Sequence, residues 1–321
     1  RHSKRGTDEV MADQATRDGF GEGLLELGKT NPNVVALSGD LEDSCRAVAF
    51  KKQYPNRFFS VGIAEQDMMG TAVGLALAGK IPFIGSYAVF NPGRNWDQLR
   101  TSVCYSKANV KIGGHHSGLS VGPDGATHQA LEDIALTRVL PNLIVLAPSD
   151  SHEAFRATVA AAEYQGPVYI RFSREKTPVF SGAHYPFTIG KANHVLAGDD
   201  VTIIAIGPVA YEAIQAAHQL QKKRISSDLI ICPTIKPLDS ETILRSAGHT
   251  RAVVTVEEHQ IDAGLGGAIA ELLAEHFPVP LERVGMPNVF GESGSFRELW
   301  AKYGLDRTAI MKAAERVIKR K

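Results

Sequence analysis

The sequence predicts an α/β protein in which a parallel sheet carries helices on both faces and a second, smaller α/β domain follows. Short apolar, β-branched segments alternate with helical patterns from Asn33 to Phe172, and the alternation resumes after an irregular stretch. Such alternation is typical of parallel sheets covered by helices, whose buried strands need nearly continuous apolar runs. The length of 321 residues also fits two domains better than one.

The expected elements follow in chain order. In the first domain the strands are VVALSGD, FFSVG, IPFIGSY, NVKIGGH, LIVLAP and VYIRFS, with helices at 64–79, 95–106, 128–138 and 152–163. In the second domain the strands are VTIIAIG, DLIICP, RAVVTVEE and PLERVG, with helices at 209–223, 263–276 and 306–319. The stretch SREKTPVFSGAHYPFTIGKAN is rich in Pro, Gly and Ser and predicts a linker. We therefore expect a first domain at 12–174, a linker at 175–193 and a second domain at 194–321.

The composition excludes several classes of protein. Lys and Arg together number 35, as do Asp and Glu, so neither nucleic acid nor an anionic membrane is expected as a partner. No apolar run reaches the length of a membrane span. The cysteines, Cys45, Cys104 and Cys232, lie too far apart for a zinc site or a disulfide framework, which favours a cytoplasmic location. Residues 1–10 lack the apolar core of a signal peptide, and we expect Met11 to be the natural start, preceded by an added segment.

A single carboxylate opens an otherwise apolar helical stretch. Glu65 follows Gly62 in RFFSVGIAEQDMMGTAVGLALAGK and stands at the predicted start of the helix. A carboxylate at that position can cap free N–H groups and is favoured by the helix dipole. The pattern is therefore equally compatible with a capping acid and with a functional one.

A glycine-rich loop gathers several titratable residues. The stretch GGHHSGLSVGPDGATHQALED contains His115, His116, Asp124 and His128, and a helix is expected to begin near Thr127. Loops at the carboxyl ends of parallel strands are where α/β proteins bind ligands. A metal cluster is the weaker interpretation, because adjacent histidines cannot easily share an ion and no Cys or spaced acid completes a ligand set.

Three motifs together resemble the pyrimidine-binding half of transketolase, a family that uses thiamine diphosphate. They are GIAEQ at 62–66, SYAVF at 86–90 and DGATHQ at 124–129. The later FGESGSFRELWAKYGLD, at 290–306, is similar to the end of transketolase-like chains. The resemblance covers about 12–321. It implies a thiamine-diphosphate-binding fold for the first domain and a transketolase C-terminal domain for the second.

The resemblance implies a role for the opening carboxylate. The acid that Glu65 matches hydrogen-bonds the cofactor's aminopyrimidine and favours its imino tautomer, which takes the proton from the thiazolium carbon. Such an acid must be shielded from water so that its hydrogen bond is strong. Phe90 matches an aromatic that stacks on the pyrimidine, although it could also be a core Phe at a strand end. Trp96 matches a further aromatic of the cofactor site, and the expected catalytic residues are Glu65 and His128.

The resemblance also implies substrate contacts. Arg17, Ser44 and Arg174 match residues that bind the phosphate of a sugar, a task that suits the planar fork of arginine. For either arginine alone, a solvated surface role is the simpler interpretation. Three residues match contacts to the sugar's hydroxyls and its phosphate-bearing end, namely His116, Asp124 and His128.

One half of a complete transketolase is missing from the sequence. We find no Gly-Asp-Gly motif with a following Asn, the pattern that holds the divalent metal and the cofactor's diphosphate in the family. The chain therefore resembles the smaller, C-terminal subunit of a split transketolase. The expected partner is a large N-terminal subunit that holds the diphosphate and Mg²⁺ or Ca²⁺, in an α2β2 heterotetramer acting on sugar phosphates.

Three alternatives to a transketolase subunit stay open. They are a deoxyxylulose phosphate synthase-like fragment, the beta subunit of a 2-oxo acid dehydrogenase, and a non-catalytic regulatory paralogue. The combination of Arg17, Ser44, His116 and Arg174 favours transketolase over the first two, and the intact Glu65 argues against the third.

Overall fold

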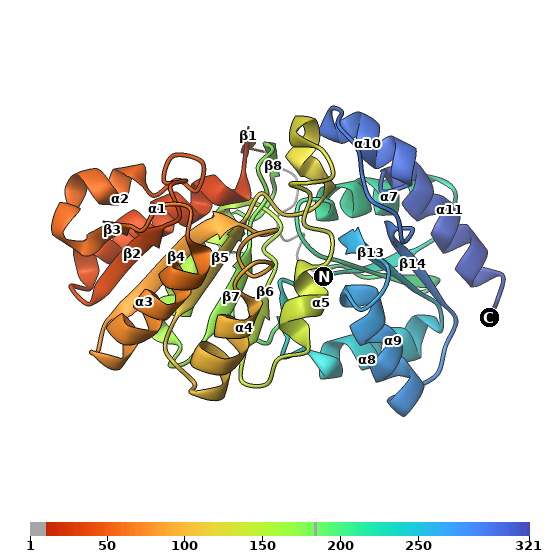
Figure 1. The fold of residues 1–321 in the computed structure, drawn as a ribbon. Coiled ribbons are helices and arrows are strands. Elements are labelled where there is room, and N and C mark those ends of the chain that lie inside the picture. The colour runs from red at the N-terminus through yellow and green to blue at the C-terminus, as the bar shows by residue number, and fades with distance from the viewer. Residues whose placement is uncertain (1–10, 183–184) are drawn as a thin grey trace.

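The computed structural model describes residues 11–182 and 185–321, and its two main sheets lie side by side (Figure 1). The seven-stranded sheet has the order β12-β6-β7-β5-β4-β2-β3, and the five-stranded sheet has the order β14-β13-β10-β11-β9. The first sheet contains β2 (Val34–Ser38), β3 (Phe58–Ser60), β4 (Ile81–Tyr87), β5 (Lys111–His115), β6 (Ile144–Leu146), β7 (Val168–Arg171) and β12 (Thr234–Lys236). The second contains β9 (Asn193–Leu196), β10 (Val201–Ala205), β11 (Ser227–Ile231), β13 (Val253–Gln260) and β14 (Leu281–Met286). The predicted α/β class is confirmed.

Helices cover both faces of each sheet. In the first domain they are α1 (Thr16–Thr30), α2 (Val48–Gln53), α3 (Glu65–Leu77), α4 (Trp96–Gln98), α5 (Asp133–Arg138) and α6 (Ser151–Glu163), with short helices η1 (Pro55–Arg57), η2 (Leu99–Tyr105) and η3 (Leu119–Asp124). In the second they are α7 (Ala210–Lys222), α8 (Ser240–Thr250), α9 (Leu265–His276), α10 (Phe296–Tyr303) and α11 (Arg307–Ile318). Within the described part of the chain, no helix combines the length and apolarity needed to cross a membrane.

The central strands are buried on both sides, as their apolar runs predict. Along β2, Val34 and Ala36 pack with α1 and α6, whereas Val35 and Leu37 pack with α3 on the opposite face. Alternate side chains of a strand point to opposite faces, so an unbroken apolar run is what a sheet covered twice requires. The parallel pairing of β2 with β3 and β4 fixes this arrangement.

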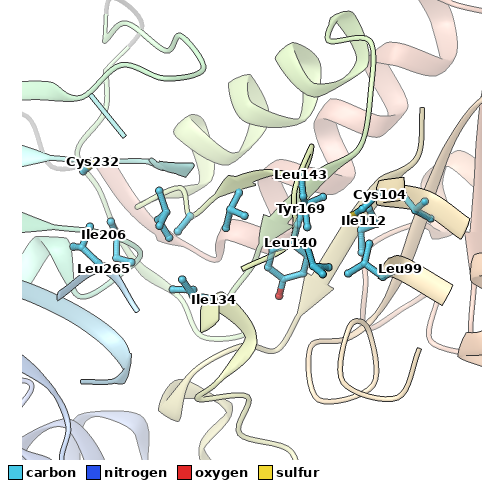
Figure 2. Close-up of a cluster of buried hydrophobic side chains, with 14 of the residues drawn as sticks. Leu99, Cys104, Ile112, Ile134, Leu140, Leu143, Tyr169, Ile206, Cys232 and Leu265 are labelled. Carbon is cyan, nitrogen blue, oxygen red and sulfur yellow. The ribbon is translucent and has the colours of Figure 1, made fainter. Parts of the chain in front are cut away.

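The two domains share one apolar core. Figure 2 shows side chains from both domains in a single cluster, among them Ile134, Leu140, Tyr169, Ile206, Cys232 and Leu265. One strand also crosses from the second domain to the first sheet. Strand β12 follows β11 in the chain, yet it pairs antiparallel with β6 of the first sheet. The expected linker is also partly ordered, since β8 (Thr177–Val179) pairs with β1 (Met11–Gln14).

Several expected helices differ from those observed. The helix expected at 95–106 is a single α-helical turn, α4, followed by the π-helix η2. The helix expected at 128–138, with a start near Thr127, is wrong in its first half, since α5 begins only at Asp133. Backbone pairing displaces that start, because the N–H of Gly118 donates to the carbonyl of Ala130 at 2.8 Å. The expectations for residues 1–10 lie outside the described residues.

Candidate active site

The carboxyl ends of four neighbouring parallel strands converge on one region of the first domain. These strands are β7, β5, β4 and β2, in that order across the sheet. Arg17 lies in the first turn of α1, and Glu65 is the first residue of α3. Helix starts and strand ends therefore meet at the edge where open parallel sheets bind ligands.

Glu65 is a buried carboxylate with two side-chain partners. Its side chain is 1% exposed. The hydroxyl of Ser86 donates to Oε1 at 3.0 Å, and the guanidinium of Arg94 donates to Oε2 at 2.6 Å. The side-chain amide of Asn95 donates to the Glu65 carbonyl at 3.1 Å. The acid is shielded from water as expected, but its immediate contacts are polar and one of them is cationic.

An aromatic ring contacts the same arginine as the acid. The Phe90 ring is nearly parallel to that of Tyr87, with centroids 6.2 Å apart, and the His128 ring meets its edge at 5.7 Å. The Arg94 Cζ lies 4.4 Å from the Phe90 centroid, a cation–π distance. Phe90 is half-buried in the segment that follows β4, and the guanidinium of Arg94 lies over its ring.

Trp96 has a different set of contacts. Its indole N–H donates to the carbonyl of Leu136 at 2.8 Å, and its ring packs against the shared core. These contacts give Trp96 a structural role, because they connect α4 to α5. The cofactor role expected for Trp96 stays a prediction.

Arg17, Ser44 and His116 lie together, as the sequence predicts. The Arg17 guanidinium donates to the carbonyl of Ser44 at 3.0 Å and lies 3.4 Å from His116 Nε2. Tyr87 joins them, because its hydroxyl donates to the Ser44 hydroxyl at 3.3 Å and its ring stacks on His116 at 3.9 Å. Arg17 Nε is buried with no hydrogen-bond partner among the described residues, so the group retains donor capacity.

The two adjacent histidines have different surroundings. Burial, followed by the charge of Arg17, lowers the pKa of His115 to about 3 and that of His116 to about 2, so both are neutral at physiological pH. The His115 ring packs between Phe20 and Phe172, with centroids 4.8 and 4.9 Å away. His116 has a φ of 53°, a left-handed conformation that is uncommon outside glycine and clusters at functional sites.

The remaining predicted residues line the glycine-rich loop. Arg174 donates to Asp124 Oδ1 at 3.1 Å and to the carbonyl of Val121 at 2.8 Å. His128 Nδ1 lies 2.9 Å from the hydroxyl of Thr127 and its ring faces Tyr87 and Phe90. Arg174 therefore joins β7 to this loop, and Asp124 already neutralises part of its charge.

The second domain holds the loop in place. The Gln129 side-chain amide donates to the carbonyl of Glu292 at 3.0 Å. A Cβ at Gly125 would lie 2.6 Å from Ser293 Oγ, and Gly125 has a φ of +75°, so glycine is required there. The FGESGSF segment thus packs on the loop that carries Asp124 and His128, through Gly125 and Gln129.

The structure adds residues that sequence reasoning gave no role. Ser86 and Tyr87 belong to the SYAVF motif, which signalled the region without separating their functions. The ion pair of Arg94 with Glu65 could not be predicted from the sequence, because an arginine in a loop is usually solvated. Among residues 11–182 and 185–321, no group of three or more His, Cys, Asp and Glu side chains could hold a metal ion.

Fold and site together define a two-domain α/β protein whose ligand site lies at the carboxyl ends of parallel strands and is completed by loop contacts from the second domain. Comparison with known families gives the particular family. Residues 12–179 match the transketolase pyrimidine binding domain, and residues 190–310 match the transketolase C-terminal domain. The chain belongs to the transketolase family.

Relatives include chains of the same extent and longer ones. A putative transketolase C-terminal section of Methanocaldococcus jannaschii is 45% identical, over 92% of this chain and 94% of that one. An apulose-4-phosphate transketolase subunit of Phocaeicola vulgatus is 38% identical, over 95% of this chain and 98% of that one. Human transketolase is 36% identical, over 95% of this chain but 49% of its own length.

A solved structure has the same architecture. It is described as a split gene transketolase, inactive beta4 tetramer, and it superposes with a TM-score of 0.90 and 43% identity, over 96% of this chain and 99% of that one.

Proposed function

We propose that this chain is the small subunit of a split, thiamine-diphosphate-dependent transketolase that transfers a two-carbon ketol unit from a ketose phosphate to an aldose phosphate. The observation that carries the proposal is the buried Glu65 carboxylate and the half-buried ring of Phe90, both in contact with the guanidinium of Arg94. The arginine and histidine cluster around Ser44 lies on the neighbouring strand ends. Family membership supports the same assignment.

The residues present fit an aminopyrimidine. The planar Arg94 guanidinium donates to Glu65 and lies on the face of Phe90, which are the two contacts that a planar, nitrogen-bearing ring would need there. Glu65 and Phe90 would therefore hold the pyrimidine of thiamine diphosphate. When bound, the cofactor supplies the carbon nucleophile of ketol transfer.

The chain's own residues supply binding and orientation. Glu65 provides a carboxylate that is fixed by Ser86 and excluded from water, so its hydrogen bond to a ring nitrogen is strong. Arg17 and Arg174 supply cationic donors for a phosphate, and His116, Asp124 and His128 supply polar groups for sugar hydroxyls. His116 is neutral, so it can act as a hydrogen-bond donor or acceptor without adding charge.

A large N-terminal subunit would complete the site. It would bind the diphosphate and hold Mg²⁺ or Ca²⁺ through oxygen ligands, and the assembly would be an α2β2 heterotetramer in the cytoplasm. Relatives of similar length, described as a transketolase C-terminal section and as a split gene transketolase, support a second chain as the source of the other half.

The experiment is reconstitution. The purified chain is mixed with the large transketolase subunit encoded in the same genome, thiamine diphosphate and Mg²⁺, and ketol transfer is compared with activity on pyruvate. We expect negligible transfer by the chain alone and a gain with the partner. Robust turnover by the chain alone would contradict the split organisation.

The same assay separates the alternatives. Condensation of pyruvate with an aldose phosphate would favour the deoxyxylulose phosphate synthase-like function, a possibility kept open by a synthase of Desulfitobacterium hafniense that is 35% identical over 93% of this chain. Oxidative decarboxylation of a 2-oxo acid would favour a dehydrogenase beta subunit. No reaction with any donor, with cofactor binding also absent, would favour a regulatory paralogue.

A further inference from the structure

Arg94 contacts both groups that are proposed to hold the cofactor's aminopyrimidine. Its guanidinium makes an ion pair of 2.6 Å with Glu65 and lies 4.4 Å from the Phe90 centroid. A carboxylate oxygen has lone pairs for two donors, so Glu65 alone could accept both groups. Two planar groups cannot cover the same face of Phe90 at once. The guanidinium and the pyrimidine therefore compete for that face.

The backbone of Arg94 makes two hydrogen bonds, whereas its guanidinium has one hydrogen-bond partner. The Arg94 N–H donates to the carbonyl of Phe90 at 3.0 Å, and the Gln66 amide donates to the Arg94 carbonyl at 3.3 Å. Within the described residues, the guanidinium has Glu65 as its hydrogen-bond and ion-pair partner. The side chain is 45% exposed, so it can turn toward solvent without any change in the backbone.

The ion pair also explains how a buried acid is tolerated before the cofactor arrives. Glu65 is almost fully removed from water, and an ionised carboxylate without a counter-charge is costly at such a site. Arg94 supplies that charge, and Ser86 supplies one hydrogen bond. A ligand that replaces Arg94 must provide equivalent donors.

We propose that Arg94 is a positioning residue that competes with the aminopyrimidine for Glu65 and for the face of Phe90, and thereby sets the affinity of this subunit for its cofactor. The inference rests on the proposed function. Cofactor entry displaces the guanidinium, so part of the binding free energy is spent on breaking the ion pair. A subunit without its partner therefore keeps the acid closed to solvent by means of its own arginine.

The test measures cofactor affinity separately from turnover. Thiamine diphosphate is titrated by calorimetry into the reconstituted complex with Mg²⁺, for the wild type and for Arg94→Ala. We expect Arg94→Ala to bind about tenfold or more tightly, the scale of one charge-assisted hydrogen bond. Arg94→Lys keeps the charge but loses the planar fork, so its affinity should lie between the two.

A matched control separates competition from a general loss of charge. Arg297 also lies over a phenylalanine ring, that of Phe296, at 5.1 Å, and within the described chain it has no ion-pair partner. Arg297→Ala should leave the cofactor affinity unchanged. If Arg94→Ala fails to fold, as circular dichroism would show, the Arg94→Lys comparison decides the question.

The outcomes are distinct. Unchanged or weaker binding by Arg94→Ala, in a complex whose wild type binds the cofactor, overturns this inference and leaves the proposed function intact. A wild-type complex that binds no thiamine diphosphate overturns both. Tighter binding by Arg94→Ala, with Arg297→Ala unchanged, supports the competition.

Discussion

Glu258, on β13 of the second domain, accepts hydrogen bonds from both the backbone N–H and the hydroxyl of Ser120 in the glycine-rich loop of the first domain. The indole N–H of Trp300 donates to the same carboxylate at 3.0 Å. The acid is fully buried, and burial raises its pKa. The second domain therefore fixes the loop that carries Asp124 and His128, which gives that domain a structural part in the candidate active site.

We expect Glu258→Gln to impair substrate binding more than the chemical step. The Ser120 N–H and the Trp300 indole both donate to Oε1, so an amide that keeps this oxygen as acceptor loses the bond that Oε2 accepts from the Ser120 hydroxyl and replaces that acceptor with a donor. The loop should loosen, KM for sugar phosphates should rise on the order of tenfold, and stability should fall by about 1–3 kcal/mol. Steady-state kinetics of the reconstituted enzyme and thermal unfolding of the chain measure the two effects.

The neighbouring acid gives a matched control. Glu257 is equally buried but accepts the backbone N–H groups of Leu265 and Gly266, at the start of α9. Glu257→Gln should lower stability without changing KM. Equal changes in KM for the two variants would show that Glu258 acts only through general stability.

Arg17→Ala should weaken the binding of phosphorylated sugars. The guanidinium is half-buried and forms no ion pair within residues 11–182 and 185–321, so a phosphate would add a charge-assisted bond contributing roughly 1.5–3 kcal/mol, or about 10- to 150-fold in apparent affinity. Arg174→Ala should cost less, because Asp124 already engages that side chain. A short unphosphorylated donor such as hydroxypyruvate should be much less affected, which kinetics with both donors would measure.

A nearby arginine serves as the control for charge. Arg46 lies in the same region, but its Nε donates to Asp18 at 2.7 Å. Arg46→Ala should not discriminate between the two donors. Equal losses for both donors in Arg17→Ala would return Arg17 to a structural or interface role.

Contacts between strand ends could be predicted from the sequence, because topology brings them together. Once alternating apolar segments indicate a parallel sheet, residues that follow its strands must share one edge, and Ser44 and His116 do so. Helices with clear apolar periodicity were also predictable, such as α6 and α7.

Features that depend on close packing could not be predicted. Helix α1 was missed because its glycines have poor helix propensity, yet a Cβ at Gly19 would lie 1.9 Å from the carbonyl oxygen of Ser151 on α6. The late start of α5 depends on the pairing of Gly118 with Ala130. The Glu65–Arg94 ion pair depends on a loop conformation that local pattern does not encode.

Glu65→Gln should abolish most activity while the fold is retained. Glutamine keeps the size and the hydrogen bond from Ser86, but it cannot share a proton with a ring nitrogen and it loses the ion pair with Arg94. We expect turnover of the reconstituted enzyme to fall on the order of 10²-fold or more. Near-normal turnover, with the fold retained, would contradict the proposed role of the Glu65 carboxylate toward the cofactor.

The last prediction concerns Glu153, a buried acid in the first turn of α6. Its Oε2 accepts the Ser149 N–H at 2.7 Å, and burial together with the adjacent Asp150 carboxylate raises its pKa to about 8, against 4.5 for a free side chain. The folded chain therefore holds a proton that the unfolded chain releases. This contribution to stability is fully present below pH 4.5 and is lost as the pH rises through 8.

We therefore expect the free energy of unfolding to decline between pH 5 and pH 8 by up to about 1.4 kcal/mol per pH unit from this group. Glu153→Gln, which is neutral at every pH, should remove that slope, whereas Glu163→Gln at the exposed end of α6 should keep it. Urea unfolding at several pH values measures the slopes. The same decline in wild type and Glu153→Gln would show that another group is responsible for the slope.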